Sequence, residues 1–139
     1  MEIFGNWFDS TIKKVNFEDI VQAIKKPEKY LIVNTLPIQE QDCLIKNTMY
    51  YDTEEKIIND LLSSYEINGK RILIYGKNSS DSTSEKKYRQ LRSLGFSEVY
   101  VYVGGLFEWL LLQDIYGAAE FPTTKKTADL LKYKPVSSF

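Results

Sequence analysis

Residues 71–112 read RILIYGKNSSDSTSEKKYRQLRSLGFSEVYVYVGGLFEWLLL and carry most of the information about the architecture. Two apolar runs rich in β-branched and aromatic residues, at 72–75 and 99–103, predict strands buried on both faces. Between them lie a polar loop and an amphipathic helix, which Gly95 is suited to close. A Gly104-Gly105 turn then leads into a second, mostly apolar helix from residue 106 to about residue 113. This order predicts two parallel strands joined by a helix.

The polar loop after the first strand consists of Gly76, Lys77, Asn78, Ser79, Ser80, Asp81, Ser82 and Thr83. In α/β proteins, the loop from a strand's carboxyl end to a helix N-terminus is the usual place for chemistry. Its N–H groups and hydroxyls could hold a phosphate, a sulfate or a carboxylate, including one from a partner protein. The alternative is a helix cap, in which Asp81 and Ser82 satisfy the first N–H groups and Ser82 has capping-box spacing to Glu85. Because Asp81 repels anions, the sequence favours the cap.

The rest of the chain also alternates helices and strands. Apolar residues at helical spacing predict a helix within residues 15–26, after a short extended start, and another over about 53–62. Apolar runs predict a strand at 30–33 and a short one at 49–51. We therefore expect an α/β fold with a mostly parallel central sheet of about five strands and helices on both faces.

The alternation of helices and strands is clearest in the middle of the chain. Residues 1–14 are expected to be an N-terminal extension, residues 15–115 the domain, and residues 116–139 a C-terminal tail packed on the domain or on a partner. The helix at 106–113 is apolar nearly all round, so the tail or another chain should cover its outer side. The aromatic segment 4–8 either folds back onto the domain or docks elsewhere.

The amino-acid composition excludes several classes of function. The 139 residues carry a formal net charge of -1 and no histidine. A charge near zero argues against a nucleic-acid binder. The lack of histidine removes Ser-His and Cys-His nucleophile pairs, histidine metal ligands and the usual proton shuttle near neutral pH. With neither a membrane-spanning run nor a signal-peptide pattern, we expect an intracellular, cytoplasmic protein with no cofactor, metal, nucleic acid or membrane among its partners.

Cys43 is the one cysteine, which rules out an internal disulfide and a multi-cysteine metal site. It could be a relocated nucleophile. Its neighbours Glu40 and Asp42 would raise the pKa of the thiol, and only Lys46 nearby is basic. A structural thiol is the better interpretation.

The segments Leu-Arg-Ser-Leu-Gly-Phe (91–96), Val-Tyr-Val-Tyr-Val (99–103) and Gly-Gly-Leu-Phe-Glu-Trp (104–109) resemble the second half of a rhodanese-like domain. In that family a strand runs into a cysteine-containing loop, and a later strand ends in Gly-Gly-x-x-x-Trp, which Gly104, Gly105 and Trp109 match. Residues 31–36 and 44–48 resemble the first half more weakly. The resemblance spans about residues 15–113 and implies the fold described above.

The departures from the family pattern bear on activity. The resemblance places the family's sulfur-carrying cysteine at Gly76 and the arginine that often closes the loop at Asp81. The aspartate and arginine after the earlier strand become Asn34 and Leu36, and the histidine position becomes Leu44. A rhodanese accepts sulfur on a thiolate that the loop's N–H groups stabilise. Glycine cannot carry a persulfide, and aspartate reverses a charge at the anion site, so the resemblance implies that the family mechanism is lost.

We therefore expect a catalytically inactive rhodanese-like domain, a pseudoenzyme that acts as a protein-interaction or scaffolding module with a protein partner or as a homo-oligomer. The alternative is a non-standard sulfurtransferase or phosphatase-like enzyme that uses the loop 76–84 or Cys43. The richness in Lys, Ile, Asn and Tyr indicates an AT-rich genome. The chain is similar to divergent rhodanese-like proteins of large DNA viruses, for which the location would be the virion or the host cytoplasm.

Overall fold

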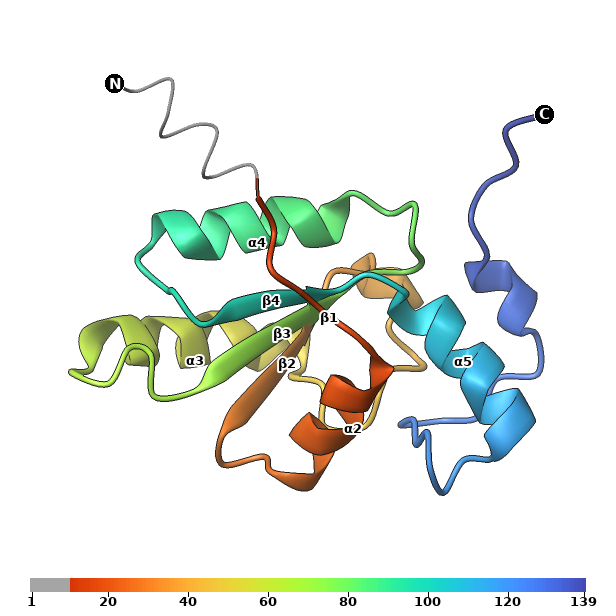
Figure 1. Ribbon diagram of the computed structural model, residues 1–139, viewed down its shortest axis with the longest axis horizontal. Coiled ribbons are helices and arrows are strands. Elements are labelled where there is room, and N and C mark those ends of the chain that lie inside the picture. The colour runs from red at the N-terminus through yellow and green to blue at the C-terminus, as the bar shows by residue number, and fades with distance from the viewer. Residues whose placement is uncertain (1–10) are drawn as a thin grey trace.

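Parallel strands form the central layer of the structure, a computed structural model that describes residues 11–139 (Figure 1). Within these residues the sheet has four strands in the order β1-β4-β3-β2. They are β1 (Lys14–Val15), β2 (Tyr30–Asn34), β3 (Arg71–Tyr75) and β4 (Val99–Tyr102). All three strand pairs are parallel, and β3 lies between β2 on one side and β4 on the other. The carboxyl ends of the strands therefore meet at one edge of the sheet.

Helices cover both faces of this sheet. The bounds are α2 (Phe17–Lys25), α3 (Tyr51–Ser63), α4 (Thr83–Ser93) and α5 (Gly105–Tyr116), with short 3₁₀ helices η1 (Ile38–Glu40) and η2 (Leu130–Tyr133). Alternate strand residues point to opposite sides: Ile32 and Leu73 join the core under α2, α5 and η2. Val33 and Ile74 join the core under α3 and α4. The expected α/β architecture, a parallel sheet with helices on both faces, is confirmed.

The sheet differs from expectation at residues 49–51, which do not form a strand. The backbone only touches the edge of the sheet there, through a bridge between Thr48 and Ile32 and a 2.8 Å bond from Met49 N to Ile32 O. Tyr50 is already the N-cap of α3, since its carbonyl accepts the N–H groups of Thr53 and Glu54. Tyr50 and Tyr51, whose aromatic side chains suggested a strand, thus belong to the start of α3.

Two helix ends are set by residues with specific capping chemistry. The Asn16 side chain accepts the N–H groups of Glu18 and Asp19, and the Asp19 carboxylate accepts the Asn16 N–H, which makes a capping box. At the end of α4, Gly95 has φ +111° and Phe96 N bonds back to Leu91 O at 3.2 Å. This Schellman-type end confirms the expected role of Gly95.

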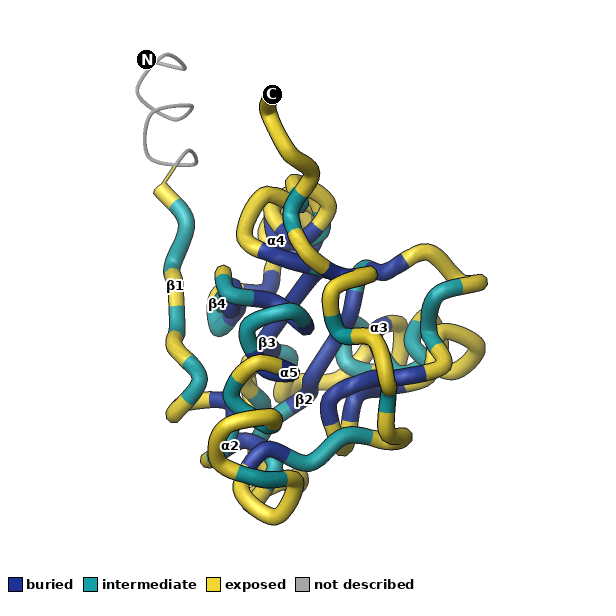
Figure 2. Tube along the Cα trace, turned by 90° about the vertical axis from the view of Figure 1, so that its right-hand side faces the viewer, coloured by how far each residue is buried: buried dark blue, intermediate teal, exposed yellow. Residues whose placement is uncertain are grey.

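The segment after α5 returns to the body and lies along it. Thr123 bridges to Ile45, and the Trp109 indole N–H donates to Pro122 O at 3.1 Å. Phe121 and Tyr133 are buried, whereas the chain beyond residue 135 is exposed and leaves the body (Figure 2). The cover over one side of α5 thus comes from this same chain.

The expected N-terminal extension is described only from residue 11, and the aromatic segment 4–8 lies outside the described residues. Lys14 of that extension pairs with Val101 at the sheet edge. Among residues 11–139, no helix combines the length and the apolar character needed to span a bilayer.

Candidate functional site

The loop between β3 and α4 lies at the carboxyl edge of the sheet, against the start of α5. Gly105 has φ +69°, and a Cβ atom there would lie 2.8 Å from Gly76 O and 2.9 Å from Asn78 N. The close approach lets the first N–H groups of α5 bond to the loop, Leu106 N to Gly76 O at 3.0 Å and Phe107 N to Lys77 O at 2.9 Å. The double glycine therefore holds the loop and the helix together.

The Asp81 carboxylate fills the inside of this loop. One oxygen, Oδ2, accepts Lys77 N–H at 2.9 Å, and the other, Oδ1, accepts Thr83 N–H at 3.0 Å and the Thr83 hydroxyl at 2.7 Å. Burial opposes ionisation, but the hydrogen bonds from Lys77 and Thr83 outweigh it and lower the pKa of the Asp81 carboxyl. The N–H groups of Lys77 and Thr83 thus point at an anion that the chain itself supplies.

This arrangement is the helix cap that the sequence favours, and Asp81 alone makes it, without Ser82. Ser82 has helical backbone angles (φ -79°, ψ -6°) and its side chain makes no capping hydrogen bond, so the capping box with Glu85 does not form. Asp81 instead bonds to the N–H two residues ahead, as Asp does in an Asx-turn.

Gly76 and Asp81 depend on each other. A Cβ atom at residue 76 would lie 2.7 Å from Asp81 Oδ2 and 3.2 Å from Thr35 Oγ1. The carboxylate can keep its inward position only because residue 76 has no side chain. Residues 76 and 81, two of the positions at which the resemblance implies a departure from the family pattern, are therefore in direct contact, a coupling that the sequence did not reveal.

The other loop residues make separate contacts. Asn78 is buried; its amide donates to Tyr133 O at 3.0 Å and accepts from Ser80 N at 2.9 Å. The Lys77 ammonium pairs with Glu40 Oε1 at 2.8 Å. Ser79, Ser80, Ser82 and Thr83 are exposed. Of the expected site residues, only Asp81 and Thr83 converge with Lys77 N at the centre of the loop.

A hollow of about 540 Å³ opens above this centre. It is lined by Thr35, Pro37, Lys77, Asn78, Ser80, Asp81, Thr83 and Val136. Thr35 follows β2 and bonds to Thr83 Oγ1 at 2.8 Å, which joins the ends of the two neighbouring strands. Thr35 was not predicted as a site residue. Its place at the end of β2 could have indicated it, because the carboxyl ends of parallel strands meet at one edge of the sheet. Val136 comes from the tail, and nothing in its sequence context indicates this location.

The rhodanese-like domain family model matches residues 14–112, most of the chain. The chain belongs to the rhodanese-like family. Solved structures agree on the fold. A yeast protein tyrosine phosphatase of the rhodanese family is 17% identical, with TM-score 0.60, and the match covers 87% of this chain and 97% of that one.

Two bacterial structures are similar to the same extent. The rhodanese-like domain of the Anabaena Alr3790 protein is 23% identical with TM-score 0.56, covering 93% of this chain and 95% of that domain. The BH2092 protein of Bacillus halodurans is 17% identical with TM-score 0.57, covering 84% and 82%. No curated protein matches the sequence significantly. At these identities the likeness concerns the fold alone.

The cysteine of this rhodanese-like chain lies away from the loop, in the core beneath the tail. Cys43 is 2% exposed, and its thiol donates to Lys125 O at 3.2 Å. Burial is the main cause that raises the pKa of this thiol, and Asp42 adds to it. The thiol therefore stays protonated and covered at neutral pH, as a structural cysteine does.

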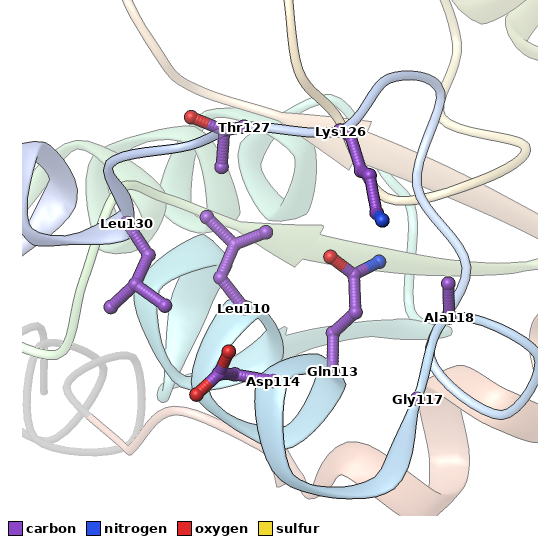
Figure 3. Close-up of a pocket in the computed structure, with 8 residues that line it drawn as sticks. All are labelled: Leu110, Gln113, Asp114, Gly117, Ala118, Lys126, Thr127 and Leu130. Atoms are coloured by element: carbon purple, nitrogen blue, oxygen red, sulfur yellow. The ribbon is translucent and has the colours of Figure 1, made fainter.

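A second hollow, of about 290 Å³, lies between α5 and the tail (Figure 3). Gln113 holds its wall together by donating to Phe121 O at 2.7 Å and Thr123 Oγ1 at 3.1 Å. Asp114 and Lys126 lie at its rim. Among residues 11–139, no group of three or more acidic or cysteine side chains is arranged to hold a metal ion.

Proposed function

We propose that this rhodanese-like domain does not transfer sulfur and acts as a protein-interaction module. The observation that carries the proposal is the contact between Gly76 and Asp81. A sulfurtransferase needs a nucleophile at the mouth of the loop, and Gly76 offers none. The Asp81 carboxylate occupies the position toward which the Lys77 and Thr83 N–H groups point.

The charge of the loop also opposes the family reaction. In that reaction a thiolate attacks the sulfane sulfur of a donor such as thiosulfate, the sulfur–sulfur bond of the donor breaks, and sulfite leaves with the electron pair. Both the donor and the persulfide product are anions. An ionised Asp81 at the centre of the loop repels both of them.

The proposal is tested by restoring the missing group. We expect the natural protein to gain no persulfide with thiosulfate and to hydrolyse no p-nitrophenyl phosphate, measured by intact mass and by absorbance. In Gly76→Cys/Asp81→Ser the closest obstacle to a side chain at residue 76 is removed and only Thr35 Oγ1, 3.2 Å from the new Cβ, must shift slightly. The introduced serine can still cap Thr83 N–H, so thiosulfate should add one sulfur atom to the introduced cysteine. The matched single variant Gly76→Cys should gain much less, because Asp81 remains in contact with residue 76.

The alternative is an enzyme that uses Cys43 or the loop 76–84 in an unfamiliar way. The buried Cys43 thiol, with its raised pKa, argues against the first form. Sulfur transfer or phosphatase turnover by the natural protein, abolished by Cys43→Ala, would overturn the proposal. So would turnover that persists in Cys43→Ala and is lost on Thr83→Ala.

An interaction role also accounts for the surface near the loop. Val136 and Phe139 are exposed, and the apolar walls of the hollow at residues 37 and 136 face solvent. A single cysteine without a disulfide partner favours an intracellular location. The cytoplasmic location and the similarity to proteins of large DNA viruses stay predictions.

A further inference from the structure

We propose that the hollow above residues 76–83 binds a basic side chain, lysine or arginine, of a partner protein. The inference rests on the proposed function, because an interaction module needs a partner, and it names that partner's chemistry. The ligand charge is the reverse of that expected for a loop whose N–H groups bind anions.

The charged groups at and next to the hollow sum to one negative charge. Asp81 lines the hollow, is half-buried and has a lowered carboxyl pKa, so it is ionised at neutral pH. Lys77 also lines the hollow, and its ammonium pairs with Glu40 Oε1 at 2.8 Å. Glu40, Lys77 and Asp81 together leave one net negative charge that attracts a cation.

The Asp81 carboxylate keeps one acceptor position that no hydrogen bond of the chain uses. A carboxylate has about four lone-pair positions. Asp81 uses two on Oδ1 and one on Oδ2, which leaves one position on Oδ2. The hollow is also lined by Ser80 and by Thr35, whose hydroxyl lies 2.8 Å from Thr83 Oγ1. Hydroxyl and carboxylate oxygens can accept hydrogen bonds, as an ammonium or guanidinium requires.

The lining of the hollow is partly apolar. Pro37 and Val136, an exposed residue of the C-terminal tail, both belong to it. Lysine and arginine side chains bury their methylene stems against apolar surface while the charged head finds a polar partner. A hollow of about 540 Å³ has the size of a small-ligand site, so a long side chain fits.

The test uses two small probes that differ only in charge. N-acetyl-arginine amide and N-acetyl-citrulline amide have nearly the same shape, and only the first is cationic. Titrations followed by amide chemical shifts should show the arginine probe binding about three- to tenfold tighter than citrulline, with the shifts centred on residues 77–83. The difference should shrink as ionic strength rises.

Matched variants separate the carboxylate from general surface charge. Asp81→Asn should remove the preference for arginine, whereas Asp114→Asn, the same change at the rim of the other hollow (Figure 3), should leave it intact. Val136→Ser should weaken both probes equally, since it removes only the apolar wall.

Three results would overturn the inference. One is equal binding of the two probes to the natural protein, and another is tighter binding of sulfate than of the arginine probe. The third is a shift of the same resonances on raising the protein concentration alone, which would assign the hollow to a second copy of this chain. These outcomes differ from sulfur transfer or phosphatase turnover, which would overturn the proposed function.

Discussion

Two segments, here called the first and the second turn, meet at the carboxyl edge of the sheet: the loop 76–83 after β3, and residues 104–109 after β4, where the chain turns into α5. The second turn has every residue of the Gly-Gly-x-x-x-Trp pattern, and these residues pack: Gly105 against the loop backbone and Trp109 in the core. The first turn lacks the cysteine and the arginine that the resemblance places there. Residues that pack are thus present on one side of the contact, and on the other side the proposed loss of the sulfur chemistry rests on residues 76 and 81.

The largest expected effect lies on the packing side. Trp109 is fully buried, and its indole contacts Tyr102 and Phe121 edge-on. Trp109→Ala should lower the free energy of unfolding by about 4 kcal/mol, measured by urea denaturation. Ile115→Ala, on the exposed side of the same helix, should change it by less than about 0.5 kcal/mol. Similar losses in both variants would show that α5 is not anchored through Trp109.

The glycine at the contact between the turns comes next. Gly105→Ala should cost about 3 kcal/mol, because backbone atoms of residues 76 and 78 block the new methyl group and φ is +69°. Gly117→Ala is the matched control: φ is +101° there, and a Cβ would meet nothing within 4 Å. It should cost about 1–2 kcal/mol from backbone strain alone. Equal costs would mean that the two turns are not in tight contact.

The coupling between Gly76 and Asp81 should be smaller. Gly76→Ala should cost about 2 kcal/mol, since its methyl group would displace the carboxylate from its hydrogen bonds. In an Asp81→Ser background the same change should cost at least about 1 kcal/mol less, which a double-mutant cycle measures. If the two substitutions changed the free energy of unfolding additively, residues 76 and 81 would not be energetically coupled.

The smallest effect is the pH dependence of the loop. Asp81→Asn should lower stability by about 1 kcal/mol at neutral pH, because the cap of Thr83 N–H and the bond from Lys77 N–H weaken. The folded-state pKa of Asp81 is lowered, so its contribution is complete above the unfolded value of about 3.9 and is lost as pH falls through the folded pKa. The stability difference between the natural protein and Asp81→Asn should therefore shrink on acidification below about pH 4. A difference that does not change with pH would assign the effect to loop geometry alone.

The sequence predicted the parts of the fold that depend on neighbouring residues. The strands at 72–75 and 99–103 are apolar and rich in β-branched and aromatic residues, and Gly95 ends α4 through a local Schellman turn. The short strand at 49–51 was wrong, because the choice between sheet edge and helix start depends on where β2 lies. Thr35 and Val136 could not be assigned to the loop, because their proximity to it is a property of the folded chain.

By itself the sequence determined the family architecture and the identity of residues 76 and 81, since periodicity and residue type are local properties of the chain. The tertiary structure decided what those two residues do. Side-chain direction and N–H orientation at the end of β3 bring the Asp81 carboxylate into the space that a side chain at residue 76 would need. Only a through-space distance links these positions, so only the folded chain shows that the loop bonds to its own carboxylate.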